Sequence, residues 1–195
     1  MDESTLAINR LAPSSPEPAA ARPSPLAPGG SRERLAELYA EYAHFVAWFA
    51  SRLLTRQDEV DDIVQEVFLI AATNLDNLSD PPKTRGWLKT VTLRRAGRFL
   101  RWKKVRARFG IAAGMQGAEE WIASPDASPE DRAALREVLS VLDELAVDLR
   151  IAWSLRHLHK ESLEDIAQLV GCSLATVKRR IAAAEARVHQ ELADD

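Results

Sequence analysis

The sequence has a single cysteine, Cys172, so it can form neither an internal disulfide nor a cysteine-based zinc cluster. No apolar run approaches the roughly 20 residues that span a bilayer, and the N-terminus lacks the basic and apolar regions of a secretory signal. The histidines show no metal-binding spacing, and there is no nucleophile motif or phosphate-binding glycine loop. These absences predict a cytoplasmic protein that is not inserted in a membrane, needs no cofactor or metal, and is not an enzyme.

The alternating period of a β-strand is also missing, whereas helical periodicity runs through two long stretches. The predicted fold class is therefore all-α, with two small helical domains joined by a flexible linker. Proline, serine and glycine enrichment marks the segments outside the domains. The predicted boundaries are a disordered tail at 1–31, a first domain at 32–109, a linker at 110–130 and a second domain at 131–195.

The charges are strongly segregated, although the net charge is only −3. Five acids and no base lie between Asp58 and Glu66, whereas ten bases and no acid lie between Arg85 and Arg108. A partner responds to the local potential within about 8–10 Å. The segregation therefore predicts one acidic surface and one basic surface, and the basic one suits nucleic acid.

The first domain is predicted to contain three helices. Apolar residues recur every three or four positions from Leu35 to Leu53 and again over about 58–74. A Pro-Pro pair predicts a loop over 76–84 before a third helix at about 84–106. That helix is expected to bury Trp87, Leu88, Val91, Phe99 and Trp102.

The second domain carries the pattern of a helix-turn-helix. Ser162 is placed to cap one helix, and Gly171 supplies a positive φ for a sharp turn. Ser173 is placed to cap the next helix, whose N-terminal half offers donors suited to base edges and phosphates. That second helix is expected to bury Leu174, Val177, Ile181 and Ala184.

Three motifs together resemble the extracytoplasmic-function (group 4) sigma factors of bacterial RNA polymerase, within the sigma-70 family. The sequence 61-DDIVQEVFLIA-71 is similar to the region-2 helix that docks on the polymerase clamp. The sequence 86-GWLKTVTLRRAGRFLRWKK-104 is similar to the promoter-melting helix. The sequence 162-SLEDIAQLVGCSLATVKRRIAAAEARV-188 is similar to the region-4 helix-turn-helix. Region 2 would then correspond to the first domain, and region 4 to the second.

The resemblance implies three sets of binding residues and two partners, core RNA polymerase and promoter DNA. An anti-sigma factor is a further partner that it allows. The implied polymerase-binding residues are Asp61, Asp62, Gln65, Glu66 and Leu69. The implied −10 residues are Asn77, Lys83, Arg85, Trp87, Arg94, Arg98 and Arg101. The implied −35 residues are Ser173, Thr176, Lys178, Arg179 and Arg180, with Lys178 nearer the flank of the helix than Arg179 and Arg180.

Three departures from the family pattern make this chain more basic. Arg94 and Arg98 stand where the family commonly has Asn and Asp, and Arg179 stands where a small Ser is common. The function implied is that of a sigma factor that directs core polymerase to specific promoters. The alternatives are a stand-alone helix-turn-helix regulator with an unrelated helical sensor domain, and an adaptor that binds only proteins. The adaptor accounts poorly for the basic helix.

Overall fold

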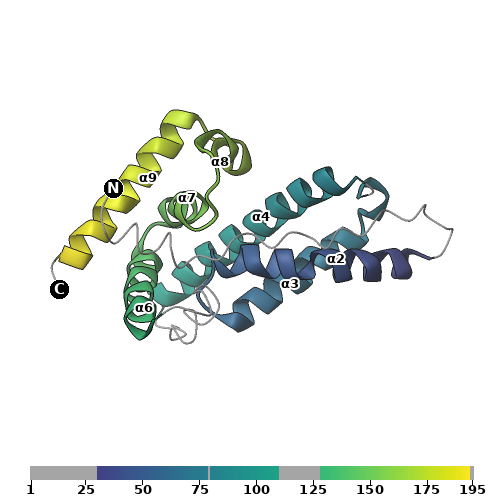
Figure 1. Ribbon diagram of the computed structural model, residues 1–195, viewed down its shortest axis with the longest axis horizontal. Helices are drawn as coiled ribbons and strands as arrows, with labels where there is room; N and C mark the ends of the chain where they lie inside the picture. The colour runs from purple at the N-terminus through teal and green to yellow at the C-terminus, as the bar shows by residue number, and fades with distance from the viewer. Residues whose placement is uncertain (1–29, 79, 110–127, 194–195) are drawn as a thin grey trace.

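A computed structural model of the chain describes residues 30–78, 80–109 and 128–193 (Figure 1). Every regular element within these ranges is a helix, which confirms the predicted all-α class. The elements are α2 Ser31–Ser51, α3 Gln57–Ala72, the 3-10 helix η1 Leu75–Asn77, α4 Pro81–Arg108, α6 Pro129–Glu144, α7 Val147–His157, α8 Leu163–Val170 and α9 Leu174–Ala193. The predicted tail and linker, apart from their edges, lie outside the described residues. None of the described helices is long and apolar enough to cross a membrane.

The first domain is formed by α2, α3 and α4, which pack against one another. Its core comes from the apolar stripes that the sequence predicts, and full burial of each such side chain contributes about 1.5–3 kcal/mol. On α2 the stripe is buried from Leu38 to Leu53, whereas Leu35 is only partly buried at its edge. On α3 the buried apolar residues are Val60, Ile63, Val64, Val67, Phe68 and Ala71, as predicted.

The connection between α3 and α4 differs from the loop predicted over 76–84. The 3-10 helix η1 occupies part of it, and α4 already begins at Pro81. The Pro-Pro pair starts the helix instead of breaking it, because a proline in the first turn lacks only an N–H that would have no intrahelical partner there. Asp80 is the N-cap residue, and its carboxylate pairs with Lys83 at 2.9 Å.

Helix α4 buries a face that differs in part from the one predicted, because Leu88 is buried as expected whereas the aromatic residues are not fully buried. The residues buried along it are Thr84, Leu88, Thr92, Leu93, Ala96, Gly97 and Leu100. Trp87, Val91 and Phe99 are only partly buried, and Trp102 is 51% exposed, so the prediction for Trp102 was wrong. The reason is that α4 contacts α7 as well as α2 and α3, and the small residue Gly97 faces Ile151 of α7.

The second domain is formed by α6, α7, α8 and α9, and its helix-turn-helix has the predicted caps. The Ser162 Oγ accepts a hydrogen bond from the Asp165 N–H at 3.0 Å, and the Ser173 Oγ accepts one from the Thr176 N–H at 3.2 Å. Gly171 has φ 68°, the left-handed conformation that the turn requires. Val177, Ile181 and Ala184 are buried as predicted. Leu174 is instead exposed at the start of α9.

The two domains pack against each other along a contact that we call the domain seam. Helix α7 lies between α4 and α9 (Figure 1), and Ile151 of α7 belongs to the same apolar cluster as the first-domain core. A Cβ atom added at Gly97 would lie 3.2 Å from the Ile151 Cδ1, so the glycine permits the close approach of α4 and α7. Lys89 of α4 also forms an ion pair across the seam with Glu161, which follows α7.

Candidate functional site

The acidic face of α3 presents all five residues implied in polymerase binding to solvent. Asp61, Asp62, Gln65, Glu66 and Leu69 are exposed, and Leu69 is 64% exposed despite its apolar side chain. Their spacing of one, three and four residues places them on one side of a helix whose opposite side is the domain core. Two of these groups have weak surface contacts: Gln57 donates to Asp61 at 2.7 Å, and Arg95 lies 3.5 Å from Glu66.

A cleft beside this face extends it in a way that the sequence did not predict. Residues of α2 and α3 line a cavity of about 670 Å³, which takes in Asp61, Gln65 and Leu69 from the predicted set. Tyr39 of α2 also lines it, is 50% exposed, and stacks at a tilt on Phe68 with ring centroids 4.8 Å apart. The signal in the sequence is an aromatic residue on the outer edge of the apolar stripe of α2. This surface, which we call the docking face after the contact that the resemblance implies, is therefore an acidic rim beside an apolar cleft.

The residues implied in −10 binding fall into two groups in space. Asn77, at the end of η1, and Lys83, in the first turn of α4, are exposed close to the start of that helix. Arg85 stacks on the Phe45 ring at 4.3 Å, and Trp87 is partly buried. The Asp80 carboxylate raises the pKa of Lys83, and Lys83 in turn lowers the pKa of Asp80.

The second group is a basic stripe along the exposed side of α4. Arg94, Arg98 and Arg101 are all exposed, as the spacing of four and three predicts. Further along, the Arg106 guanidinium lies over the Trp102 ring at 4.5 Å. This stripe places three guanidinium groups on one surface of a 28-residue helix, a geometry suited to the backbone of a nucleic acid.

The residues implied in −35 binding gather at the N-terminal half of α9. Ser173 and Thr176 share a hydrogen bond at 2.9 Å, which ties the side chain of Thr176 to the helix cap. Lys178 and Arg179 are exposed. Arg180, which was expected to point outward, instead pairs with Asp148 of α7 at 2.7 Å and is 26% exposed. Arg180 lies at the edge of the exposed face of α9, where its guanidinium can reach the Asp148 carboxylate.

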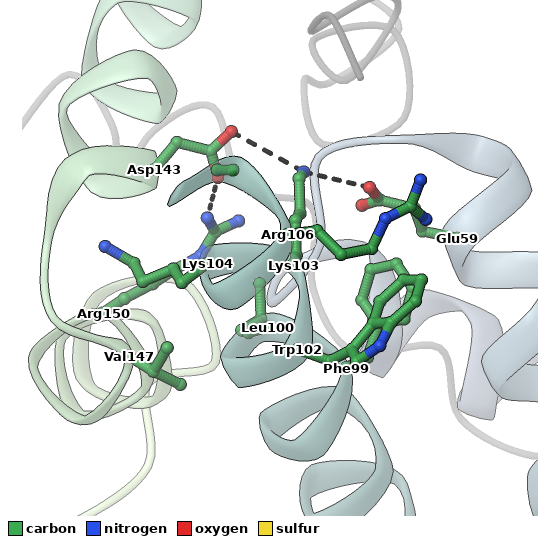
Figure 2. A pocket seen from close by; sticks show the side chains of 11 residues that line it. Glu59, Phe99, Leu100, Trp102, Lys103, Lys104, Arg106, Asp143, Val147 and Arg150 are labelled. Carbon is green, nitrogen blue, oxygen red and sulfur yellow. Dashed lines mark hydrogen bonds and ion pairs between the residues drawn. The ribbon is translucent and has the colours of Figure 1, made fainter. Parts of the chain in front are cut away.

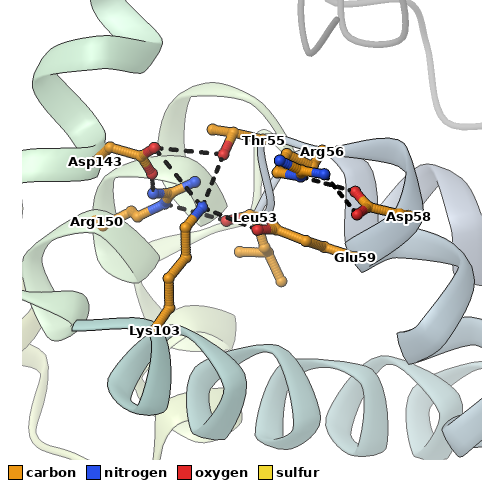
Figure 3. Close-up of polar contacts among 8 residues, drawn as sticks. All are labelled: Leu53, Thr55, Arg56, Asp58, Glu59, Lys103, Asp143 and Arg150. Atoms are coloured by element: carbon orange, nitrogen blue, oxygen red, sulfur yellow. Dashed lines mark hydrogen bonds and ion pairs between the residues drawn. The ribbon is translucent and has the colours of Figure 1, made fainter. Parts of the chain in front are cut away.

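A buried polar cluster at the domain seam is the feature that sequence reasoning missed most completely (Figure 2 and Figure 3). Arg150 of α7 is buried, donates to the Leu53 carbonyl at 3.1 Å and pairs with Asp143. Lys103 of α4 lies between Asp143, at 3.9 Å, and Glu59, at 2.9 Å. Burial lowers the pKa of Arg150 to about 10, which still leaves it charged at neutral pH. Residue spacing does not indicate this pairing, because its members are far apart along the chain.

The cluster borders a cavity of about 230 Å³ between the domains, shown in Figure 2. Phe99, Trp102 and Val147 supply part of its apolar wall, and Lys104 beside them donates to the Glu144 carbonyl at 2.9 Å. Burial, together with nearby cations, lowers the pKa of Lys104. Within the described ranges, no group of three His, Cys, Asp or Glu residues is placed to hold a metal ion.

Comparison with known protein families supports the resemblance from both domains. The family model of sigma-70 region 2 matches residues 38–106, and that of sigma-70 region 4 matches residues 135–188. The first match contains α3 and nearly all of α4, and the second contains the helix-turn-helix. Each family model therefore falls on the domain for which the sequence motifs predicted it.

The curated relatives that match the chain are also RNA polymerase sigma factors. The chain is 28% identical over 159 residues to the ECF RNA polymerase sigma-E factor of Escherichia coli, covering 78% of this chain and 83% of that protein. It is 32% identical over 136 residues to the probable RNA polymerase sigma factor RfaY of Xanthomonas campestris, covering 68% of this chain but only 34% of RfaY.

Two solved structures share the fold. One is the sigma factor RpoE in complex with the anti-sigma factor NepR from Bartonella quintana, with a TM-score of 0.60 at 21% identity, covering 84% of this chain and 99% of that one. The other is CnrH in complex with the cytosolic domain of CnrY, with a TM-score of 0.54 at 24% identity, covering 86% and 92%. With a region-2 domain, a region-4 domain and relatives across both, the chain belongs to the extracytoplasmic-function sigma factors of the sigma-70 family.

Proposed function

We propose that this protein directs core RNA polymerase to specific promoters and starts transcription there. The observation that carries the proposal is the division of surfaces within one chain: an acidic docking face on α3, a basic stripe on α4 and a helix-turn-helix ending in α9. A stand-alone regulator would need the last of these but neither of the first two. A sigma factor needs all three surfaces. The sigma-70 family, moreover, is not a class of enzymes.

The docking face would bind the polymerase clamp by charge complementarity and burial of apolar surface. Asp62 and Glu66 would meet basic clamp residues, while Leu69 and the neighbouring Tyr39 cleft would accept apolar side chains. Complementary charges speed association and select the partner, and an apolar contact at the centre supplies most of the affinity. The exposure of Leu69 and Tyr39 in the isolated chain supports such a contact, because large exposed apolar side chains that lie together commonly mark an interaction site.

Helix α4 would hold the −10 region of the promoter. Its Arg94, Arg98 and Arg101 stripe would contact phosphates as the strands separate. Asn77 and Lys83, which are close to the connection between η1 and α4, would help to capture an unstacked base, since binding residues commonly lie in connecting segments. The replacement of Asn and Asp by Arg94 and Arg98 would make this contact depend more steeply on salt than in the family pattern.

Helix α9 would enter the major groove of the −35 element by its N-terminal half. Ser173 and Thr176 are fixed by their mutual hydrogen bond, and Arg179 projects next to them. An arginine can bind guanine through two hydrogen bonds, whereas a lysine acts as a point charge near a phosphate. We therefore assign base reading to Arg179 and phosphate contact to Lys178.

This assignment predicts different effects for two adjacent substitutions. Arg179→Ala should cost about 1–3 kcal/mol of binding free energy and relax selectivity at one −35 position. Lys178→Ala should weaken binding to all promoters alike. It should also reduce the slope of the logarithm of the binding constant against the logarithm of salt concentration by about one unit. Transcription from a series of −35 substitutions at two salt concentrations separates the two. Equal loss on every promoter for both variants would reduce α9 to an electrostatic anchor.

The proposed partners are core RNA polymerase and promoter DNA, in the cytoplasm, where polymerase acts. One of the two structural neighbours was solved in complex with an anti-sigma factor, so we propose a protein of that kind as a further partner. The whole proposal is tested by adding the purified chain to core polymerase on a promoter library and asking whether promoter-specific transcripts form.

A further inference from the structure

The cavity of about 230 Å³ between the domains is lined by a buried carboxylate with one oxygen that has no partner. Glu59 of α3 lines this cavity, and its side chain is only 7% exposed. Its Oε1 pairs with Lys103 at 2.9 Å, whereas its buried Oε2 accepts no hydrogen bond from the described residues. Buried polar atoms in folded proteins are nearly always hydrogen-bonded. The Glu59 Oε2 therefore points to a hydrogen-bond donor supplied by a ligand.

Aromatic rings form a second wall of the same cavity. Phe99 and Trp102 of α4 both line it, with ring centroids 6.1 Å apart and planes at 43° (Figure 2). Trp102 is 51% exposed, so a planar ring that entered the cavity would cover apolar surface that now faces solvent. A flat apolar surface beside a hydrogen-bond acceptor is what a protein needs to bind a nucleobase by stacking and by its edge.

The charge of the cavity lining favours an anion. Its charged residues are Lys103, Lys104, Arg106, Arg150, Glu59 and Asp143. Four cations against two carboxylates leave an excess of two positive charges. Neither Lys104 nor Arg106 forms an ion pair within the described part of the chain: Lys104 donates to the Glu144 carbonyl, and Arg106 lies over the Trp102 ring. A phosphate near these two side chains would supply the charge that the cavity lacks.

The size of the cavity divides such a ligand into two parts. Pockets that enclose a whole drug-sized ligand usually measure roughly 300–1,000 Å³, and this cavity is smaller. It is large enough for the ring system of a base but leaves no room for a phosphate chain. Arg106 is exposed beside Trp102, so it can hold phosphates that remain in solvent.

The polar groups in the cavity favour adenine over guanine. The Glu59 Oε2 can accept one hydrogen bond, and the Lys103 amine bound to the other oxygen can donate to a neighbouring acceptor. Adenine has an amino group next to a ring nitrogen, which is one donor beside one acceptor. Guanine has two adjacent N–H donors on its pairing edge. One of them would lose its hydrogen bond to water without gaining another, which is unfavourable in a buried site.

We propose that this cavity binds an adenine nucleotide, with the base between Glu59 and the Trp102 ring and the phosphates on Arg106 and Lys104. Both domains contribute to the site, because Asp143 of α6 lies 3.9 Å from the Lys103 amine. The proposal does not rest on the proposed function, since it uses the cavity alone and involves neither polymerase nor promoter.

Equilibrium binding of ATP to the purified full-length chain, in the absence of polymerase, tests the proposal. Isothermal titration calorimetry compares ATP with GTP, which changes the base, and with inorganic tripolyphosphate, which has no base. We expect saturable binding of one ATP per chain, about tenfold tighter than binding of either other probe. The absence of saturable ATP binding would overturn the proposal, and so would an affinity for GTP or tripolyphosphate that equals the affinity for ATP.

Substitutions on α4 locate the site. Arg106→Ala and Trp102→Ala remove exposed side chains from the cavity wall, so the fold should be retained, and each should weaken ATP binding about tenfold. Arg98→Ala is the matched control, because Arg98 is exposed on the same helix but does not line the cavity. Its ATP affinity should stay within about twofold of the wild type. An equal loss for Arg98→Ala and Arg106→Ala would place ATP on the basic stripe and overturn the site.

Glu59→Gln tests the contact with the base. The substitution keeps the size of the side chain and removes the carboxylate, so it should reduce the preference for ATP over GTP several-fold and leave tripolyphosphate binding unchanged. An unchanged preference in a variant that circular dichroism shows to be folded would overturn the assignment of adenine to Glu59. If the variant does not fold, the exposed Trp102 and Arg106 substitutions still decide the outcome. Promoter-directed transcription without ATP binding by the free chain would refute this site and leave the proposed function intact.

Discussion

Reversing the charge of Asp62 and Glu66 to lysine should weaken binding to core polymerase by several kcal/mol, which is at least a hundredfold in affinity. The reason is that the substitutions would place like charges opposite the basic residues expected on the clamp, and such juxtaposition costs several kcal/mol. Folding should be retained, because both side chains are exposed and face away from the core of the first domain. Fluorescence anisotropy with purified core enzyme measures the change.

A control for net charge is available on the neighbouring helix. Glu33 and Glu37 are exposed on α2, four residues apart, and neither lines the docking cleft. Their double reversal to lysine changes the charge of the domain by the same amount and should leave polymerase affinity within a fewfold of the wild type. Equal affinity for the Asp62/Glu66 variant and the wild type would refute the assignment of the α3 face.

Replacing Arg150 by alanine should have the largest effect on stability, a loss of about 3–5 kcal/mol in the free energy of unfolding. Removing one member of a buried ion pair leaves the other charge without its partner, which is the origin of that magnitude. The Leu53 carbonyl would also lose its donor. Urea denaturation followed by circular dichroism measures the loss.

A compensating variant tests the cause of this effect. Arg150→Met combined with Asp143→Leu removes both charges and keeps apolar volume at the seam, and such replacements are often neutral. The double variant should therefore be markedly more stable than Arg150→Ala. A loss below about 1 kcal/mol for Arg150→Ala would show that the pair contributes little to the fold.

The local features of the fold could be predicted because each depends on residues close in sequence. The apolar spacing on α3, the cap at Ser162 and the left-handed Gly171 all follow from rules that act within one or two helical turns. The same rules place the five residues implied in polymerase binding on one exposed face. The spacing of apolar residues therefore predicts the buried face correctly for a helix such as α3, which packs on one core.

The features that could not be predicted depend on contacts between distant segments. Trp102 is exposed because α4 contacts α7 through small residues such as Gly97, and helical periodicity alone does not indicate a second packing partner. Arg150 pairs across the seam with Leu53, 97 residues earlier in the chain. The start of α4 at Pro81 was missed for a different reason, since a proline pair is compatible with either the end or the beginning of a helix.

In the proposed function, one chain gives core polymerase its promoter specificity through two separate DNA-binding surfaces. The most direct measurement is transcription by purified core polymerase on a promoter library, with the wild-type chain, with the Asp62/Glu66 reversal and without any added protein. We predict discrete start sites that require the wild-type chain, that share two upstream elements, and that are lost with the reversal. Transcripts that are the same with and without the chain, alongside DNA binding by the chain alone, would contradict the account and favour a stand-alone regulator.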